Sequence, residues 1–229
     1  MKRIIGIISV LLCSISLLAQ SDKDTERNNF LIHVDKEQER AIFEEDLSLR
    51  FYAEEISRLL IPTNTSFGMV LKPSLFKESS ITYDTEQQML VYTTIDDNKT
   101  IWGCVCDATE IIEDGVTRLR DKPENYTAPK MKNYRLAISK KAAKNLAALW
   151  TAAINAARPS KTEHTYLDGT SREFFINGRY AQARGAKDGR VLRLINLING
   201  LRTAILEGDT QRAEMLCQES VTIKESFQK

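Results

Sequence analysis

The sequence is poor in the residues and motifs on which enzyme chemistry most often depends. Its 229 residues include only two histidines, His33 and His164, and four cysteines. It contains no Gly-x-Ser-x-Gly nucleophile elbow, no calcium-binding loop and no phosphate-cradling glycine loop. Cys104-Val105-Cys106 has the wrong spacing for a zinc knuckle, and no histidine pair lies near it. Because these motifs are absent, we predict no catalytic residue, no metal site and no cofactor.

Proline and glycine are also scarce, with 5 and 10 copies, and no segment is proline-rich, collagen-like or internally repeated. Apolar residues make up 42% of the chain and charged residues 28%, which is ordinary for a globular protein. A chain of this length can bury a core without cross-links. We expect one globular domain over residues 20–229, with a soft boundary near 115–130.

The first residues resemble a Gram-negative bacterial secretory signal. Lys2 and Arg3 precede an uncharged, largely apolar run from Ile4 to Leu18, and Ala19-Gln20 opens into a polar stretch. The apolar run is shorter than the roughly 20 residues that span a bilayer, which favours cleavage before Gln20 over a retained anchor. We expect residues 1–19 to be a signal peptide and the mature chain to be periplasmic or secreted, with no transmembrane span.

Three cysteines would remain after cleavage: Cys104, Cys106 and Cys217. An oxidising compartment favours disulfides. Cys104 and Cys106 are predicted on one face of a strand, and a bridge between such close neighbours would be strained. A disulfide would therefore join Cys217 to Cys104 or Cys106. The alternative is that all three are buried thiols.

Helical periodicity predicts helices in both halves of the chain. Apolar residues recur at spacings of three and four from Lys36 to Leu60, before Pro62, so we expect one long N-terminal helix. Ser139 is placed to cap an alanine-rich central helix that Pro159 ends. Two further helices, capped by Asp188 and Asp209 and separated by Gly208, should form a C-terminal helical hairpin.

Strand signals lie between these helices. Met89–Ile95 and Thr100–Cys106 both alternate, with turn-forming residues between them, and this predicts a hairpin. A second hairpin is predicted within Thr165–Arg184, where Asp168-Gly169 and Asn177-Gly178 are turn signals. Weaker strand candidates are 67–71, 80–83, 109–112 and 133–138. The predicted fold class is α+β, with a mostly antiparallel sheet.

Charge is distributed unevenly along the chain. Residues 20–114 carry 20 acidic and 9 basic side chains, whereas residues 115–229 carry 11 acidic and 21 basic ones. One interpretation is a basic surface that binds an anionic partner outside the cell, such as lipopolysaccharide, an acidic glycan or another protein. The alternative is that the two halves fold against each other and their charges cancel. Nucleic acid is disfavoured because the aromatic residues of the basic half are scattered.

These observations favour an exported, non-enzymatic binding or interaction protein of the bacterial cell envelope. The candidate ligand-binding residues surround the second predicted hairpin, and they are Arg172, Arg179, Arg184 and Arg190. One alternative is a small envelope hydrolase that uses His164 with a cysteine or a carboxylate. Another is a structural component of an envelope assembly. The sequence leaves the oligomeric state open.

Overall fold

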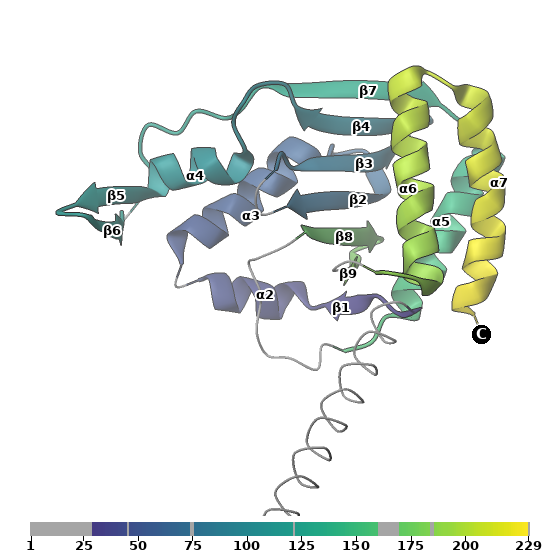
Figure 1. Cartoon of the computed structure of the whole chain (residues 1–229), viewed down its shortest axis with the longest axis horizontal. Coiled ribbons are helices and arrows are strands. Elements are labelled where there is room, and N and C mark those ends of the chain that lie inside the picture. Colours follow the sequence, from purple (N-terminus) through teal and green to yellow (C-terminus); the bar gives the residue numbers. More distant parts are fainter. Residues whose placement is uncertain are drawn as a thin grey trace, which may run out of the picture.

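A seven-stranded antiparallel sheet forms the centre of the protein, seen in a computed structural model that describes residues 29–44, 46–73, 76–120, 122–159, 170–183 and 186–228 (Figure 1). The strand order is β1-β9-β8-β2-β3-β4-β7, and a separate hairpin, β5–β6, projects from the body. The strands are β1 (Ile32–Val34), β2 (Thr65–Pro73), β3 (Ser79–Asp84), β4 (Met89–Ile95), β5 (Glu110–Glu113), β6 (Val116–Leu119), β7 (Met131–Ala137), β8 (Thr170–Ile176) and β9 (Arg179–Ala183). The expected α+β class with a mostly antiparallel sheet is confirmed.

Helices cover both faces of this sheet. They are α2 (Lys36–Phe43), α3 (Leu47–Leu60), α4 (Ile101–Thr109), α5 (Lys140–Asn155), α6 (Gly189–Glu207) and α7 (Thr210–Phe227). The largest core cluster lies between one sheet face and α5, α6 and α7, and a smaller cluster joins the other face to α3 and α4. Successive strand residues point to opposite faces, so Phe174 enters the first cluster and Phe175 the second.

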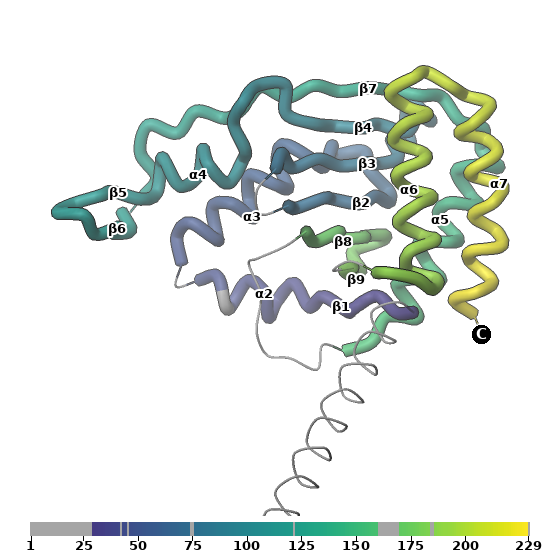
Figure 2. The backbone as a smooth tube through the Cα atoms, viewed as in Figure 1, coloured from purple at the N-terminus to yellow at the C-terminus, as the bar shows by residue number. Residues whose placement is uncertain are grey.

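Strands from both halves of the sequence share the sheet. β7 pairs with β4, and β8 pairs with β2, so residues beyond 130 lie beside residues before 115. The earliest strand, β1, is at one edge beside β9, which follows about 150 residues later in the chain (Figure 2). Among the described residues, we find no helix whose length and apolar content would let it cross a bilayer. Residues 1–19, the expected signal peptide, lie outside the described part.

Several predicted boundaries are confirmed. The hydroxyl of Ser139 accepts a hydrogen bond from the Ala142 amide at the start of α5, at 3.1 Å. Asn177 and Gly178, with φ of 49° and 72°, form the two-residue turn between β8 and β9. Gly208 ends α6 with φ of 69°. Asp209 caps α7. Asp168-Gly169 lies outside the described residues.

The prediction of one helix over 36–60 was wrong. α2 ends at Phe43, and Asp46 begins α3 as a cap that accepts a hydrogen bond from the Leu49 amide at 3.0 Å. An aspartate at a helix start satisfies an amide that has no partner within the helix. The apolar periodicity continued across this break, whereas the capping signal at Asp46 marked it.

The predicted hairpin of 89–95 with 100–106 was also wrong in its second half. β4 is a strand, but it pairs with β3 and β7, and residues 101–109 form the helix α4. Two interactions fix the start of α4. Thr100 accepts a hydrogen bond from the Gly103 amide, and the fully buried carboxylate of Glu78 accepts one from each of the amides of Ile101 and Trp102, all at 2.9 Å. Cys104 and Cys106 are therefore on a helix, not on a strand.

Gly68 on β2 leaves room for Phe175 on the sheet face that α3 and α4 cover. The carbonyl of Gly68 accepts a hydrogen bond from the buried indole of Trp150, at 2.7 Å. A Cβ at this position would lie 2.8 Å from both the Ile81 carbonyl oxygen and the Phe175 ring. The absent side chain is thus a steric requirement of the central strands.

We predict that Gly68→Ala lowers the free energy of unfolding by about 2 kcal/mol, because overpacking at backbone atoms cannot be relieved by a rotamer change. Chemical denaturation would measure this. The matched control is Gly200→Ala in α6, where the added methyl meets only the side chain of Leu216, at 3.1 Å or more. The gain in helix propensity there, about 1 kcal/mol, should offset that contact. Equal losses in the two variants would contradict the steric explanation.

Candidate functional site: a pocket beside helix α6

A pocket of about 640 Å³ lies where α6 leaves part of the sheet uncovered. α6 crosses the strands and covers only part of their length (Figure 1). Beyond it, the floor of the pocket comes from residues of β2, β3, β4 and β8, and Arg202 of α6 forms one wall. The volume lies in the range of small-molecule binding sites.

The register of the sheet explains which side chains meet on the floor. Arg172 of β8 is opposite Leu71 of β2, Leu71 is opposite Ser79 of β3, and Ser79 is opposite Thr94 of β4. Each of these positions is two residues from a member of the larger core cluster, so all four share the face that α6 partly covers. At about 4.8 Å per strand, this row is about 14 Å long.

Two guanidinium groups meet in this pocket. Burial lowers the pKa of Arg172, and the positive charge of Arg202 lowers it further. The Nε of Arg202 is buried and has no hydrogen-bond partner among the described residues. Within the same part of the chain, no aspartate or glutamate lines the pocket, and Lys77 adds a third cation to its wall. The pocket is therefore positively charged and has an unused buried donor.

Of the four arginines predicted from the sequence, only Arg172 lines this pocket. Arg179, at the start of β9, donates to the side-chain oxygen of Asn155. Arg184 lies outside the described residues. Arg202 was missed as a ligand candidate, although it falls four residues after Ile198, at the border of the apolar stripe of its helix. A cation at that border is the signal that could have found it.

Arg190 makes contacts within the fold and does not line the pocket. Its guanidinium donates to the backbone oxygens of Asn29 and of Ser226, the latter at 2.6 Å, and so joins the start of the described chain to α7. It also lies 4.1 Å from the centre of the Phe30 ring, whose distance to the Arg158 guanidinium is 3.5 Å. These internal contacts fix the guanidinium between two backbone oxygens and a ring, so Arg190 is not directed at a ligand pocket.

The three cysteines in the described part of the chain, Cys104, Cys106 and Cys217, are free thiols. α4, with Cys104 and Cys106, packs on one face of the sheet, and Cys217 of α7 lies in the core cluster of the other face. The sheet therefore separates Cys217 from its predicted partners, and that disulfide is not formed. Burial raises the pKa of all three thiols, to about 12 for Cys106 and Cys217. Little thiolate exists at neutral pH, which argues against a cysteine nucleophile.

The histidines contribute no described site. His33 is exposed on the edge strand β1, and His164 lies outside the described residues. In the ranges that the structure describes, no three His, Cys, Asp or Glu side chains are grouped as a metal site would require.

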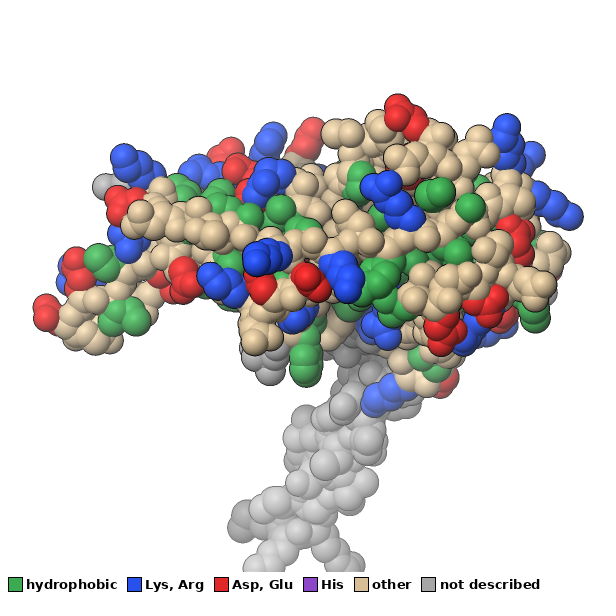
Figure 3. Space-filling view, turned by 90° about the horizontal axis from the view of Figure 1, so that it is seen from above, with side chains coloured by type: hydrophobic (Ala, Val, Ile, Leu, Met, Phe, Trp, Pro, Cys, Tyr) green, Lys and Arg blue, Asp and Glu red, His purple; other side chains and the backbone are tan. Residues whose placement is uncertain are grey.

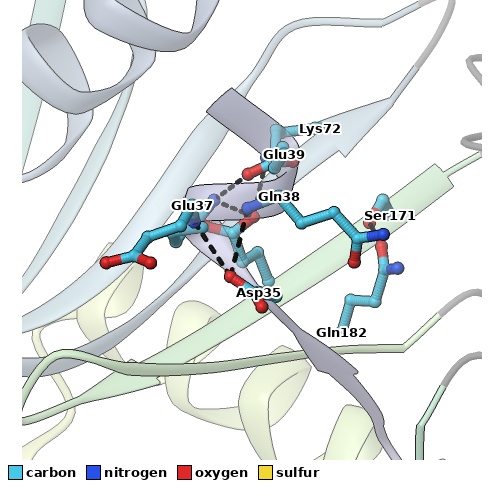
Figure 4. A network of polar contacts seen from close by, with 9 residues as sticks. Asp35, Glu37, Gln38, Glu39, Lys72, Ser171 and Gln182 are labelled. Atoms are coloured by element: carbon cyan, nitrogen blue, oxygen red, sulfur yellow. Dashed lines mark hydrogen bonds and ion pairs between the residues drawn. The ribbon is translucent and has the colours of Figure 1, made fainter. Parts of the chain in front are cut away.

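The opposite face of the sheet carries a buried charge cluster around α2 (Figure 4). The Glu173 side chain, 8% exposed, accepts hydrogen bonds from the ammonium groups of Lys36 at 2.8 Å and Lys72 at 2.9 Å. Lys36 also donates to Glu39 at 2.6 Å. Asp35 begins α2 by accepting hydrogen bonds from the next helix amides, as the dashed lines show. Here each charge has a partner, so the cluster fastens α2 to the sheet.

Surface charges of both signs are interspersed over the face seen from above (Figure 3). The ammonium of Lys132, from the basic half, lies 3.9 Å from the Asp96 carboxylate of the acidic half. Such exposed pairs each contribute at most about 1 kcal/mol. Their mixing means that the excess positive charge of residues 115–229 does not form one uniform surface on this face.

Searches with the chain against models of known protein families, curated proteins and solved structures found no match in any of the three.

We predict that Glu173→Gln lowers the free energy of unfolding at pH 7 by about 3 kcal/mol, because the partly buried ammonium of Lys72 loses its counter-charge and that of Lys36 keeps only Glu39. Burial alone would raise the pKa of Glu173, but Lys72 and Lys36 more than compensate and lower it below the ordinary 4.5. The stabilisation from a lowered carboxyl pKa is complete above the unfolded value and is lost as the pH falls through the folded value.

The free energies of unfolding of Glu173→Gln and of the unchanged protein should therefore become more similar below about pH 4.5. Urea denaturation across the acid range would measure this. Glu219→Gln, at an exposed position on α7, is the matched control and should change stability by less than about 0.5 kcal/mol. A pH-independent loss in Glu173→Gln would show that packing, and not the carboxylate charge, is responsible.

Proposed function

We propose that the protein is an exported, non-enzymatic binding protein of the bacterial cell envelope, and that it recognises an anionic ligand in the pocket of Arg172 and Arg202. The proposal rests on one observation. Two guanidinium groups line the same pocket, and no described carboxylate lines it with them. The charged start and apolar run of residues 1–19 support export.

The electrostatics of the pocket favour an oxyanion as ligand. Burial lowers the pKa of Arg172, and repulsion from the nearby cation Arg202 lowers it further. An oxyanion between them would remove this repulsion and give the buried Nε of Arg202 an acceptor. Guanidinium groups match the geometry of carboxylate and phosphate oxygens, and hydrogen bonds to such charged groups are among the strongest in proteins.

Within the basic half of the sequence, only a small part of the positive charge belongs to the proposed site. β8 and α6, which supply the two arginines, both belong to residues 115–229. Arg190 is held by internal contacts, and Lys132 is paired with Asp96. Arg172 and Arg202 differ from these because no ion pair neutralises them among the described residues.

A role in an envelope assembly is a second candidate, and the β5–β6 hairpin favours it. The hairpin projects from the body (Figure 1). Three apolar side chains on it, Ile112, Val116 and Leu119, are 49% to 75% exposed. An isolated two-stranded hairpin is only marginally stable in water. If this hairpin joins copies of the chain, light scattering will show stable oligomers that Ile112→Ser dissociates. A monomer at high concentration would exclude this role for self-assembly.

To test ligand binding, we would follow thermal unfolding of the purified protein with lipopolysaccharide, peptidoglycan fragments, acidic glycans and neutral oligosaccharides. A site-specific anion at 100 times its Kd should add about 2.7 kcal/mol of stability, or about 5 to 10 °C in Tm. High salt should weaken the effect, because it screens charge. No stabilisation by any anionic ligand would contradict the proposal.

The variant for this test is Arg172→Gln/Arg202→Gln, which removes both charges while keeping polar side chains of some length. It should bind no anion, and its Tm without ligand should not fall, because the repulsion is gone. Arg193→Gln makes the same change at an exposed position of α6 and should respond to ligands like the unchanged protein. If Arg193→Gln loses binding equally, a diffuse basic surface is responsible and not the pocket.

A further inference from the structure

The pocket combines its cations with an apolar wall. Leu71, Pro73, Phe76 and Tyr92 line it together with the arginines. Phe76 is 73% exposed, and of the exposed large hydrophobic residues in the described ranges it alone lines the pocket. The ring of Phe76 is open to solvent beside the cations, and covering it with an apolar group of a ligand would be favourable. This wall therefore offers contact area that a bare inorganic anion would not use.

The apolar and polar groups follow an order along the floor. The cross-strand row begins with Arg172, continues with Leu71 and ends with the hydroxyls of Ser79 and Thr94. Directly opposite residues have Cβ atoms about 5 Å apart, so the charged end and the hydroxyl end are separated by an apolar step. Pro73 and Phe76 extend this apolar step along the wall of the pocket.

We propose that the pocket binds a small organic acid, with its carboxylate or phosphate between Arg172 and Arg202 and its apolar body against Leu71 and Phe76. This inference rests on the proposed function and adds the class of ligand. The length of the row, about 14 Å, suits an acid with an aromatic or branched body rather than a long polymer. The hydroxyls at the far end can accept or donate one hydrogen bond each to a polar group on that body.

Isothermal titration calorimetry of the purified protein with a matched set of probes tests this proposal. 4-Phenylbutyrate and phenyl phosphate carry both an oxyanion and a ring, acetate and inorganic phosphate carry the oxyanion alone, and 4-phenylbutyramide carries the ring without the charge. At least one of the first two should bind about tenfold or more tightly than its ring-free counterpart and than the neutral amide, because each lost contact is expected to weaken binding by about that factor.

Two variants assign these effects to the pocket. Phe76→Ser should lower the affinity for the ring-bearing acids about tenfold and leave the affinities for acetate and inorganic phosphate unchanged. Arg172→Gln should lower the affinity for every anionic probe. Met215→Ser, at a residue of α7 that is also 73% exposed, is the control for loss of an exposed apolar side chain and should change no affinity.

The outcomes separate this inference from the function on which it rests. If acetate and inorganic phosphate bind as tightly as the ring-bearing acids, and Arg172→Gln abolishes both, the anion site stands and the organic-acid assignment is overturned. If the amide binds as tightly as the acid, the pocket is an apolar cleft and both proposals fail. If no probe binds, the organic-acid assignment is overturned, while the proposed function is decided by thermal unfolding with the envelope ligands.

Discussion

Both faces of the sheet are covered by helices, and this constrains every charged side chain on its inner strands. A charge removed from water needs a partner, because burial without one costs several kcal/mol. Glu78 meets the requirement with two backbone amides at the start of α4. Glu173 meets it with the ammonium groups of Lys36 and Lys72. The sheet thus carries buried carboxylates, and each has a defined counterpart.

Arg172 and Arg202 differ from these carboxylates in one respect. They are partly buried at the point where α6 stops covering the sheet, and no described carboxylate lines their pocket. A fold that pairs its other buried charges but leaves two like charges together is expected to do so for a ligand, since natural cores rarely keep unsatisfied polar groups without a reason. The contrast between the two sheet faces is the physical basis of the proposed site.

Local signals in the sequence predicted the elements whose ends depend on nearby residues. Ser139, Asn177-Gly178 and Gly208 fix their boundaries through caps and positive φ, and all were read correctly. α4 was misread because its decisive partner, Glu78, lies more than twenty residues away in the sequence. Ile101, Cys104, Val105 and Ala108 are buried at helical spacing, but the flanking alternation favoured a strand. Long-range capping cannot be recognised from a window of neighbouring residues.

The candidate site shows the same division between local and tertiary information. Arg172 was identified from its place in a basic segment, whereas its proximity to Arg202 of α6 arises only in the folded chain. Charge counted along the chain suggested a broad basic surface. Folding instead interleaves the two halves in one sheet and occupies Arg190 and Lys132 with internal contacts. The charge asymmetry therefore matters most at Arg172 and Arg202, two partly buried cations whose pocket no described carboxylate lines, and this arrangement supports our proposal of a small, defined ligand.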